Sequence, residues 1–202
     1  LLPRLKALCV QAKGYDIGLN IDAEEADRLD ISLDLLEALA QDDALAGWAG
    51  LGFVVQAYQK RAPAVLDFVI DLARRSGQRL MVRLVKGAYW DAEIKRAQID
   101  GLAGYPVYTR KVYTDLSYLA CAKKLLAARD AIYPQFATHN AATIAAILQM
   151  GAKSGAPFEL QRLHGMGEGV YREVLKNPLI AGRVYAPVGA HKDLLAYLVR
   201  RL

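Results

Sequence analysis

Arg83 and Lys86 stand in an otherwise apolar segment, MVRLVKG at residues 81–87, where charged side chains are costly to bury. Strand side chains alternate between two faces, so the two cations point to opposite sides of the strand that this segment predicts. A guanidinium inside a protein needs an acid or an anionic ligand, and for Arg83 both an ion pair with Asp22 and a ligand contact remain open. Gly87 permits a ligand to approach the backbone closely. The segment therefore predicts part of a site for a polar ligand.

Thr138, His139 and Asn140 place a hydroxyl, an imidazole and an amide directly after another apolar segment. His139 by itself is typical of a structural histidine. Beside Asn140 as a helix N-cap, and beside the N–H groups of a helix N-terminus, it becomes a candidate for binding an anionic or hydrogen-bonding group. The chain's three histidines lack the spacing of a metal site, so no metal is predicted.

Arg200 and Arg201 lie off the leucine stripe of the last predicted helix. That placement is typical of a solvated face. Two adjacent guanidiniums also suit a carboxylate, because each planar fork can bind it through two hydrogen bonds. Tyr89 and Trp90 leave a similar choice open, between packing at the rim of a site and offering aromatic faces to a ligand. Periodicity alone does not decide either case.

Short apolar segments, each followed by a polar residue and an amphipathic stretch, recur along the chain. Strands are predicted at residues 16–22, 52–58, 80–86, 135–139, 158–164 and 183–188. Helices are predicted at residues 3–13, 63–76 and 115–130, after Asp91 and Asn140 as N-caps, and in three further leucine- and valine-rich stretches; residues 101–114 are predicted as a loop. Alternating strands and helices indicate a parallel sheet, whose strand ends gather their polar residues at one rim.

Two α/β architectures have this pattern: an open doubly wound sheet and a (β/α)8 barrel, which is also called a TIM barrel. A dinucleotide-binding sheet should show G-x-G-x-x-G after its first strand, but the sequence there is Asp22-Ala-Glu-Glu. We therefore expect the barrel. Six strands make about six of its eight βα units, so residues 1–202 are predicted to be a single domain, the C-terminal three-quarters of such a barrel.

The composition is that of an ordinary globular chain, with 54% hydrophobic and 23% charged residues. The formal charge is +5, but Lys and Arg are scattered among acids, so no nucleic acid is predicted as a partner. No apolar run approaches the roughly 20 residues of a membrane helix, and no signal peptide is evident. Cys9 and Cys121 are expected to be buried thiols of a reducing compartment, and a cytoplasmic location is predicted.

Several motifs resemble the proline dehydrogenase family, most closely the proline dehydrogenase domain of the bacterial bifunctional proline utilization A enzymes. They are NIDAEEADRL at 20–29, RLVKGAYWD at 83–91, ATHN at 137–140, LHGMGE at 163–168, YAPVG at 185–189 and LAYLVRR at 195–201. The resemblance covers essentially the whole chain. It implies a distorted (β/α)8 barrel with non-covalent FAD that oxidises L-proline to Δ1-pyrroline-5-carboxylate by hydride transfer to flavin N5, the first step of proline catabolism.

The resemblance also implies roles for individual residues. Arg83 would reach the flavin near N5 and act in catalysis together with Tyr185. The positions expected to hold FAD are Gln56, Arg83, Val85, Lys86, Gly87, Ala88, Trp90, Thr138, His139, Asn140 and Gln161. Those expected at the substrate are Asp22, Tyr89, Leu163, Tyr185, Arg200 and Arg201. The implied partners are membrane quinone as electron acceptor, a fused or separate pyrroline-5-carboxylate dehydrogenase domain, and a peripheral contact with the inner membrane.

Two alternatives remain. The family carries a substrate-binding lysine on an earlier strand that this chain lacks, so the chain could be a non-catalytic barrel fragment. A Schiff-base aldolase barrel with Lys86 as nucleophile is the other. Against it stands the expected placement of Lys86 on the face opposite Arg83.

Overall fold

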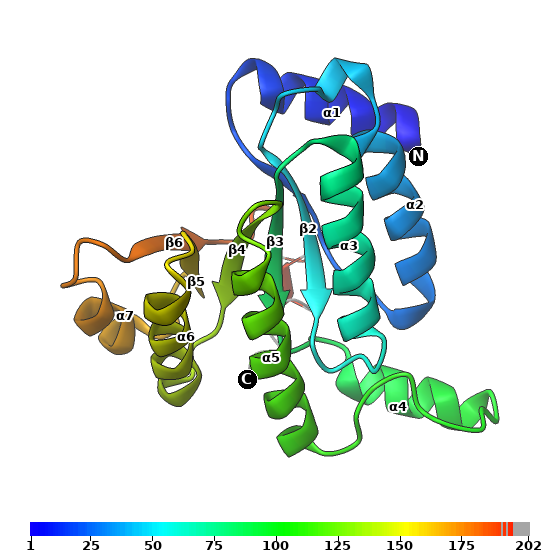
Figure 1. The fold of residues 1–202 in the computed structure, drawn as a ribbon. Coiled ribbons are helices and arrows are strands. Elements are labelled where there is room, and N and C mark those ends of the chain that lie inside the picture. The colour runs from blue at the N-terminus through cyan, green and yellow to red at the C-terminus, as the bar shows by residue number, and fades with distance from the viewer. Residues whose placement is uncertain (191, 193, 196–202) are drawn as a thin grey trace.

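Parallel strands and helices alternate along the chain and curl into a half-barrel (Figure 1). The computed structural model describes residues 1–190, 192, 194 and 195. Within them the sheet has six parallel strands in sequence order: β1 (Leu19–Ile21), β2 (Leu51–Gln56), β3 (Leu80–Val85), β4 (Ile132–Ala137), β5 (Glu159–Leu163) and β6 (Ala181–Tyr185). The prediction of an incomplete α/β barrel is confirmed.

The helices are α1 (Leu2–Gly14), α2 (Leu29–Ala40), α3 (Ala62–Ser76), α4 (Trp90–Ile99), α5 (Lys111–Ala127), α6 (Ala141–Ser154) and α7 (Glu168–Val174). Short 3-10 turns lie at η1 (Ala26–Arg28) and η2 (Asp43–Leu45). Helices α2, α3, α5 and α6 stand along the outer face of the sheet, α1 lies across the amino ends of the strands, and α4 lies beyond their carboxyl ends (Figure 1). In the described residues no helix is both long and apolar enough to cross a membrane.

Strand β3 shows how the sequence builds two different faces. Leu80, Val82 and Leu84 are fully buried, whereas the side chains between them, including Arg83, are half-buried. The buried set packs against the helical layer, and the alternate set faces the concave interior. The predicted alternation is confirmed, and it turns Arg83 toward the interior.

The core between sheet and helices is closely packed. Tyr118 of α5 and Phe136 of β4 are fully buried, and the Phe136 ring meets the edge of the Phe158 ring at a centroid distance of 5.7 Å. Gly151 in α6 makes room for this pair, because a Cβ there would lie 2.3 Å from Phe158. Both cysteines, Cys9 in α1 and Cys121 in α5, are free and buried as expected. Burial raises the pKa of both thiols, which keeps them protonated.

The predicted element boundaries need several corrections. Strand β4 begins at Ile132, before Pro134, because a proline removes a single backbone donor and leaves the pairing of its neighbours intact. The strand ends at Ala137, so residues 138 and 139 lie beyond it. Strand β1 is shorter than predicted, β6 begins two residues earlier than predicted and ends at Tyr185, and α5 starts at Lys111 inside the expected loop. Asp91 is not the N-cap of α4: the cap is Tyr89, and Asp91 lies in the first turn, where its charge favours the helix dipole.

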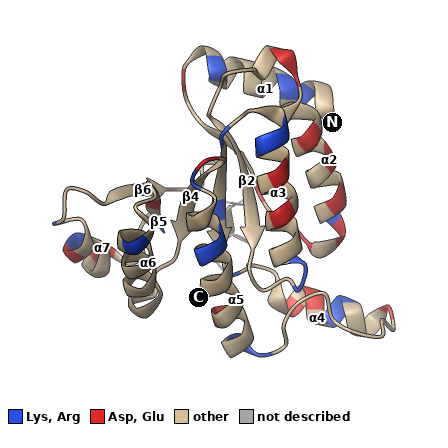
Figure 2. Cartoon of the chain, viewed as in Figure 1, with Lys and Arg blue, Asp and Glu red and all other residues tan. Residues whose placement is uncertain are grey.

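Acidic and basic residues are interleaved along the outer helices (Figure 2). Arg75 pairs with both Asp71 of its own helix and Glu37 of α2, and Lys124 of α5 pairs with Asp67 of α3. These exposed pairs contribute little each. Basic residues on these outer helices thus lie among acids on a surface that faces water.

Candidate active site

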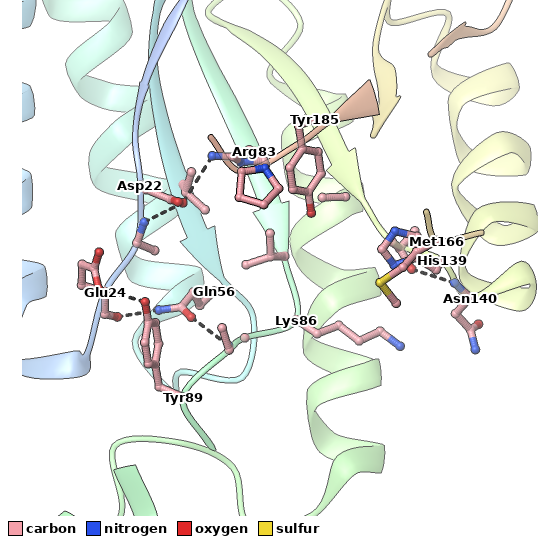
Figure 3. A pocket seen from close by; sticks show the side chains of 18 of the residues that line it. Asp22, Glu24, Gln56, Arg83, Lys86, Tyr89, His139, Asn140, Met166 and Tyr185 are labelled. Carbon is pink, nitrogen blue, oxygen red and sulfur yellow. Dashed lines mark hydrogen bonds and ion pairs between the residues drawn. The ribbon is translucent and has the colours of Figure 1, made fainter. Parts of the chain in front are cut away.

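A cavity of about 680 Å³ opens at the carboxyl ends of the strands (Figure 3). It is lined by residues at the carboxyl ends of the six strands and in the segments that follow them, as expected where the loops after parallel strands meet at one rim. The predicted site residues that line it are Asp22, Gln56, Arg83, Val85, Lys86, Gly87, Ala88, Tyr89, Thr138, His139, Asn140 and Tyr185. Residues far apart in sequence are thus brought together.

Arg83 forms one wall of this cavity. Its Nη2 lies 3.3 Å from Asp22 Oδ1, and its guanidinium carbon lies 5.5 Å from the centre of the Tyr185 ring. The Asp22 side chain is 73% exposed, so this ion pair is strongly screened by water. Arg83 Nε is buried and has no hydrogen-bond partner among the described residues. The ion pair considered from the sequence is present, and it still leaves part of the guanidinium for a ligand.

Gln56 joins the two loops that form the opposite wall (Figure 3). Its Nε2 donates to the Glu24 carbonyl oxygen at 2.8 Å, and its Oε1 accepts from the Ala88 N–H at 3.2 Å. The Tyr89 hydroxyl donates to Glu24 Oε2 at 2.8 Å, which adds a second link between the same loops. Because Gln56 uses both ends of its amide on backbone groups, its immediate effect is to fix the shape of the wall.

Gly87 gives this wall its close packing. Its φ is +144°, a conformation that residues with a Cβ rarely adopt, and a Cβ there would lie 2.4 Å from the ring of Tyr58. The backbone at residue 87 therefore packs directly against the buried Tyr58 ring. Desolvation raises the pKa of that hydroxyl well above its ordinary value, so the ring remains neutral.

Gly87→Ala is expected to destabilise the protein by roughly 2 to 4 kcal/mol, from backbone strain together with overpacking against Tyr58. Urea unfolding of both proteins measures the difference. Gly104→Ala is the matched control, because Gly104 is an exposed loop glycine with no atom within 4 Å of the added Cβ. Equal stability of the two variants would show that the Tyr58 contact does not constrain residue 87.

Lys86 points away from Arg83, as the alternation predicts, although it also lines the cavity (Figure 3). Its Nζ lies 2.5 Å from Oδ1 of Asp115 in α5, and the same carboxylate pairs with Lys111 at 2.6 Å. Hydrogen bonds from Lys111 and then Lys86 lower the pKa of Asp115, so its negative charge persists well below neutral pH. A Schiff-base lysine reacts as the free amine. The pairing with Asp115 therefore weighs against the aldolase alternative.

The segment after β4 is held by its own hydrogen bonds. Asn140 is the N-cap of α6, as predicted, and its Oδ1 accepts from the Thr143 N–H at 2.9 Å. Thr138 Oγ1 accepts from the Asn140 N–H at 3.2 Å. His139 Nε2 accepts from the Leu163 N–H at 3.0 Å, so the proton of a neutral ring lies on Nδ1. The cap and the imidazole thereby set the position of this side of the cavity.

Some predicted residues lie outside the cavity lining. Trp90 is 43% exposed and donates to the Tyr108 carbonyl oxygen at 2.8 Å. Leu163 and Gln161 are buried in β5, beside Tyr185 and Arg183 of β6. Arg200 and Arg201 lie outside the described residues. The lining residues that sequence reasoning missed are Ala23, Glu24, Val54, Ala137, Met166, Ala186 and Pro187. Glu24, two residues after Asp22 in a polar loop, could have been predicted from its charge. The others lack a distinctive side-chain chemistry.

A half-barrel of parallel strands with a polar cavity at their carboxyl ends defines a ligand-binding protein of the α/β-barrel class. Comparison with known proteins narrows the class: a family model described as proline dehydrogenase matches residues 1–202, so the chain belongs to the proline dehydrogenase family. The resemblance noted in the sequence is confirmed.

Curated relatives agree with this assignment. The chain is 66% identical over 212 residues to the bifunctional protein PutA of Escherichia coli K12 and 64% identical over 206 residues to that of Rhizobium meliloti. All of the chain is covered in both comparisons, but it spans only 16% and 17% of those proteins. It is 29% identical to proline dehydrogenase 1 of Bacillus subtilis 168, of which it spans 59%.

Solved structures agree as well. A crystal structure of a bifunctional proline utilization A protein matches with a TM-score of 0.95 at 60% identity, over 99% of this chain and 20% of that one. The protein of Bdellovibrio bacteriovorus, described as inactivated by N-propargylglycine, matches with a TM-score of 0.94 at 33% identity, over 99% of this chain and 21% of that one. The half-barrel is thus the fold of the corresponding region in these enzymes.

Proposed function

We propose that this chain carries the FAD-dependent oxidation of L-proline to Δ1-pyrroline-5-carboxylate, the first step of proline catabolism to glutamate. The observation that carries the proposal is Arg83, a cation at the cavity wall with a buried Nε that lacks a partner among the described residues. Membership of the proline dehydrogenase family supplies the reaction class. The inactivation of the Bdellovibrio relative by an amino-acid analogue supports a small amino acid as the substrate.

The residues present fit a flavin. An oxidised isoalloxazine carries several hydrogen-bond acceptors and one ring N–H. The donors of Arg83 line the cavity, and Gln161 of the neighbouring strand β5 holds a buried acceptor, Oε1, that has no partner among the described residues. The cavity volume is within the usual range for organic ligands, about 300 to 1,000 Å³. The residues that we propose to hold the cofactor are Gln56, Arg83, Val85, Lys86, Gly87, Ala88, Trp90, Thr138, His139, Asn140 and Gln161. Bound FAD would supply the acceptor for the hydride that leaves the substrate.

The chain's own residues then position charge and substrate. An arginine side chain is a fixed positive charge in proteins, so the guanidinium at residue 83 would favour the electron-rich reduced cofactor. Tyr185, whose ring lies against the Arg83 guanidinium, would form the substrate wall together with Asp22, Tyr89 and Leu163. Arg200 and Arg201 are proposed to bind the substrate carboxylate, because paired planar forks suit a carboxylate.

The larger protein is proposed by analogy with the bifunctional relatives. Residues 1–202 would form a single domain, the C-terminal three-quarters of an eight-stranded barrel, and a pyrroline-5-carboxylate dehydrogenase domain would lie elsewhere in the protein or in a partner. Quinone is the proposed electron acceptor. A cytoplasmic protein with a peripheral contact at the inner membrane face would bring the reduced cofactor to it.

The absorption spectrum of the full-length protein tests this function. The purified protein is expected to show flavin bands, and anaerobic L-proline is expected to bleach them. Glycine is the control, since it presents the same carboxylate without the ring. A flavin-replete protein whose spectrum L-proline leaves unchanged would exclude proline oxidation.

A further inference from the structure

A buried carboxylate holds together a cluster of polar side chains from strands β4, β5 and β6. Glu159 of β5 is 3% exposed. Arg183 of β6 binds it with two hydrogen bonds, at 2.8 Å from Nε and 3.0 Å from Nη2. Gln161 Nε2 donates to its Oε1 at 2.6 Å, and Gln135 Nε2 donates to the same atom at 3.1 Å. Burial by itself would raise the pKa of Glu159, but the hydrogen bonds from Arg183, Gln161 and Gln135 lower it, so the group is a carboxylate at neutral pH.

An ionised carboxylate can only accept hydrogen bonds. Each amide that faces Glu159 must therefore turn its nitrogen toward it and its oxygen away. Gln135 passes this direction on, because its Oε1 accepts from Asn20 Nδ2 at 2.9 Å. Gln161 Oε1 is left buried with no partner among the described residues, in a side chain that is 2% exposed. The charge of Glu159 thus turns the Gln161 amide so that its nitrogen faces the carboxylate and its oxygen points away from it.

The strand register places Gln161 next to a residue that lines the cavity. Ala137 of β4 lines the cavity and pairs with Gln161, and Gln56 and Val85, which also line it, pair with each other on β2 and β3. Glu159 lies two residues before Gln161 on the same strand, toward the amino end and on the same face. A buried amide oxygen without a donor is costly, so a ligand that supplies one gains affinity there.

We propose that Glu159 is a positioning residue of the cofactor site. It holds the Gln161 amide in the orientation that presents its oxygen to a flavin donor, either the ring N3–H or a ribityl hydroxyl. This inference rests on the proposed function, since it takes FAD as the ligand. Glu159 would not contact the cofactor itself, and its effect would pass through Gln161.

A double-mutant cycle on FAD binding tests the role in the full-length protein. Glu159→Gln keeps the side-chain shape but can donate as well as accept, so it no longer fixes the neighbouring amide. It is expected to raise the dissociation constant of FAD about tenfold, the weight of one well-placed hydrogen bond. In a Gln161→Met background the same substitution is expected to change it less than about twofold. Independent, multiplying effects of the two substitutions would overturn the positioning role.

The cycle has two safeguards. Glu173→Gln, which removes an exposed carboxylate paired with Lys176 at 2.6 Å, is the matched control and should leave FAD binding unchanged. If Glu159→Gln fails to fold, Glu159→Gln with Arg183→Met removes the charge together with its partner, and the same loss and the same dependence on Gln161 are expected. Binding that is insensitive to this pair in a folded protein would also overturn the inference.

A spectroscopic readout distinguishes the two donors. With flavin labelled by 15N at N3, a shift of the N3 resonance in Glu159→Gln assigns the ring N–H as the partner of Gln161. An unmoved resonance together with weakened, Gln161-dependent binding assigns a ribityl hydroxyl. Both results support the positioning role, whereas an unmoved resonance with unchanged binding contradicts it.

The outcomes also separate this inference from the proposed function. A wild-type protein that does not bind FAD overturns both. One that binds FAD with independent effects at residues 159 and 161 overturns the positioning role alone. One that shows the coupling but does not oxidise L-proline retains the positioning role and overturns the activity.

Discussion

Replacing Arg83 with methionine is expected to lower kcat/KM for L-proline by about 10²- to 10³-fold, the usual cost of removing one preorganised charge from a reacting centre. Methionine preserves much of the apolar stem but removes the positive charge at the cavity wall. Because its partner Asp22 is largely exposed, loss of the ion pair between Arg83 and Asp22 is expected to cost little folding stability. Steady-state kinetics with an artificial electron acceptor, on flavin-replete protein, measure the effect.

Arg79→Met is the matched control. Arg79 precedes the amino end of β3, donates to the Ile132 carbonyl oxygen at 3.4 Å and lies 5.4 Å from the Tyr133 ring centre, outside the cavity lining. Its replacement is expected to leave kcat/KM within a few-fold of the wild-type value. If both arginine variants lose activity equally, the position of Arg83 at the cavity has no special role.

Phe136→Ala is expected to cost about 3 to 5 kcal/mol of folding stability, the largest effect that we predict for a core position. The side chain is fully buried between the sheet and its helical layer, and its ring contacts Phe158 in an edge-to-face arrangement. Truncation removes this aromatic pair and leaves a cavity that the close-packed neighbours fill only in part. Urea unfolding monitored by circular dichroism gives the difference in free energy.

Leu179→Ala provides the comparison, since Leu179 is 88% exposed. A change within about 0.5 kcal/mol is expected there. A small loss of folding stability in Phe136→Ala would mean that the side chains around β4 repack to fill the cavity, which would contradict the close packing beside Gly151.

Sequence patterns predict the sheet well where each strand carries its own signal. The alternation in β3 predicts which side of the strand Arg83 faces, and Asn140 marks the start of α6. The ends of strands are less predictable where tertiary packing overrides a local sequence preference. Pro134 lies inside β4 because the neighbouring strands hold that segment extended, and a reading based on the proline alone places the start too late.

The site is predictable for the residues that follow strand ends and much less so for their partners. Asp22, Gln56 and Arg83 can be assigned to one rim from the parallel βα pattern. The links from Glu159 to Gln135 and Arg183 depend on strand register between segments 24 residues apart, which no local pattern specifies. The alternation of Glu159 and Gln161 around a buried Leu160 did hold a signal, because it marks a polar interior face.

The order of the strands carries a consequence for biosynthesis. Each strand from β2 to β6 pairs with the strand that precedes it in the chain, so every ladder closes over a single intervening crossover. Closing a short loop costs less entropy than a distant pairing. During translation, each new strand can pair with the preceding strand, which has already left the ribosome. These six strands can therefore be added in chain order from β1 to β6, and Arg83 of β3 and Glu159 of β5 come to share the interior face only after β5 has been added.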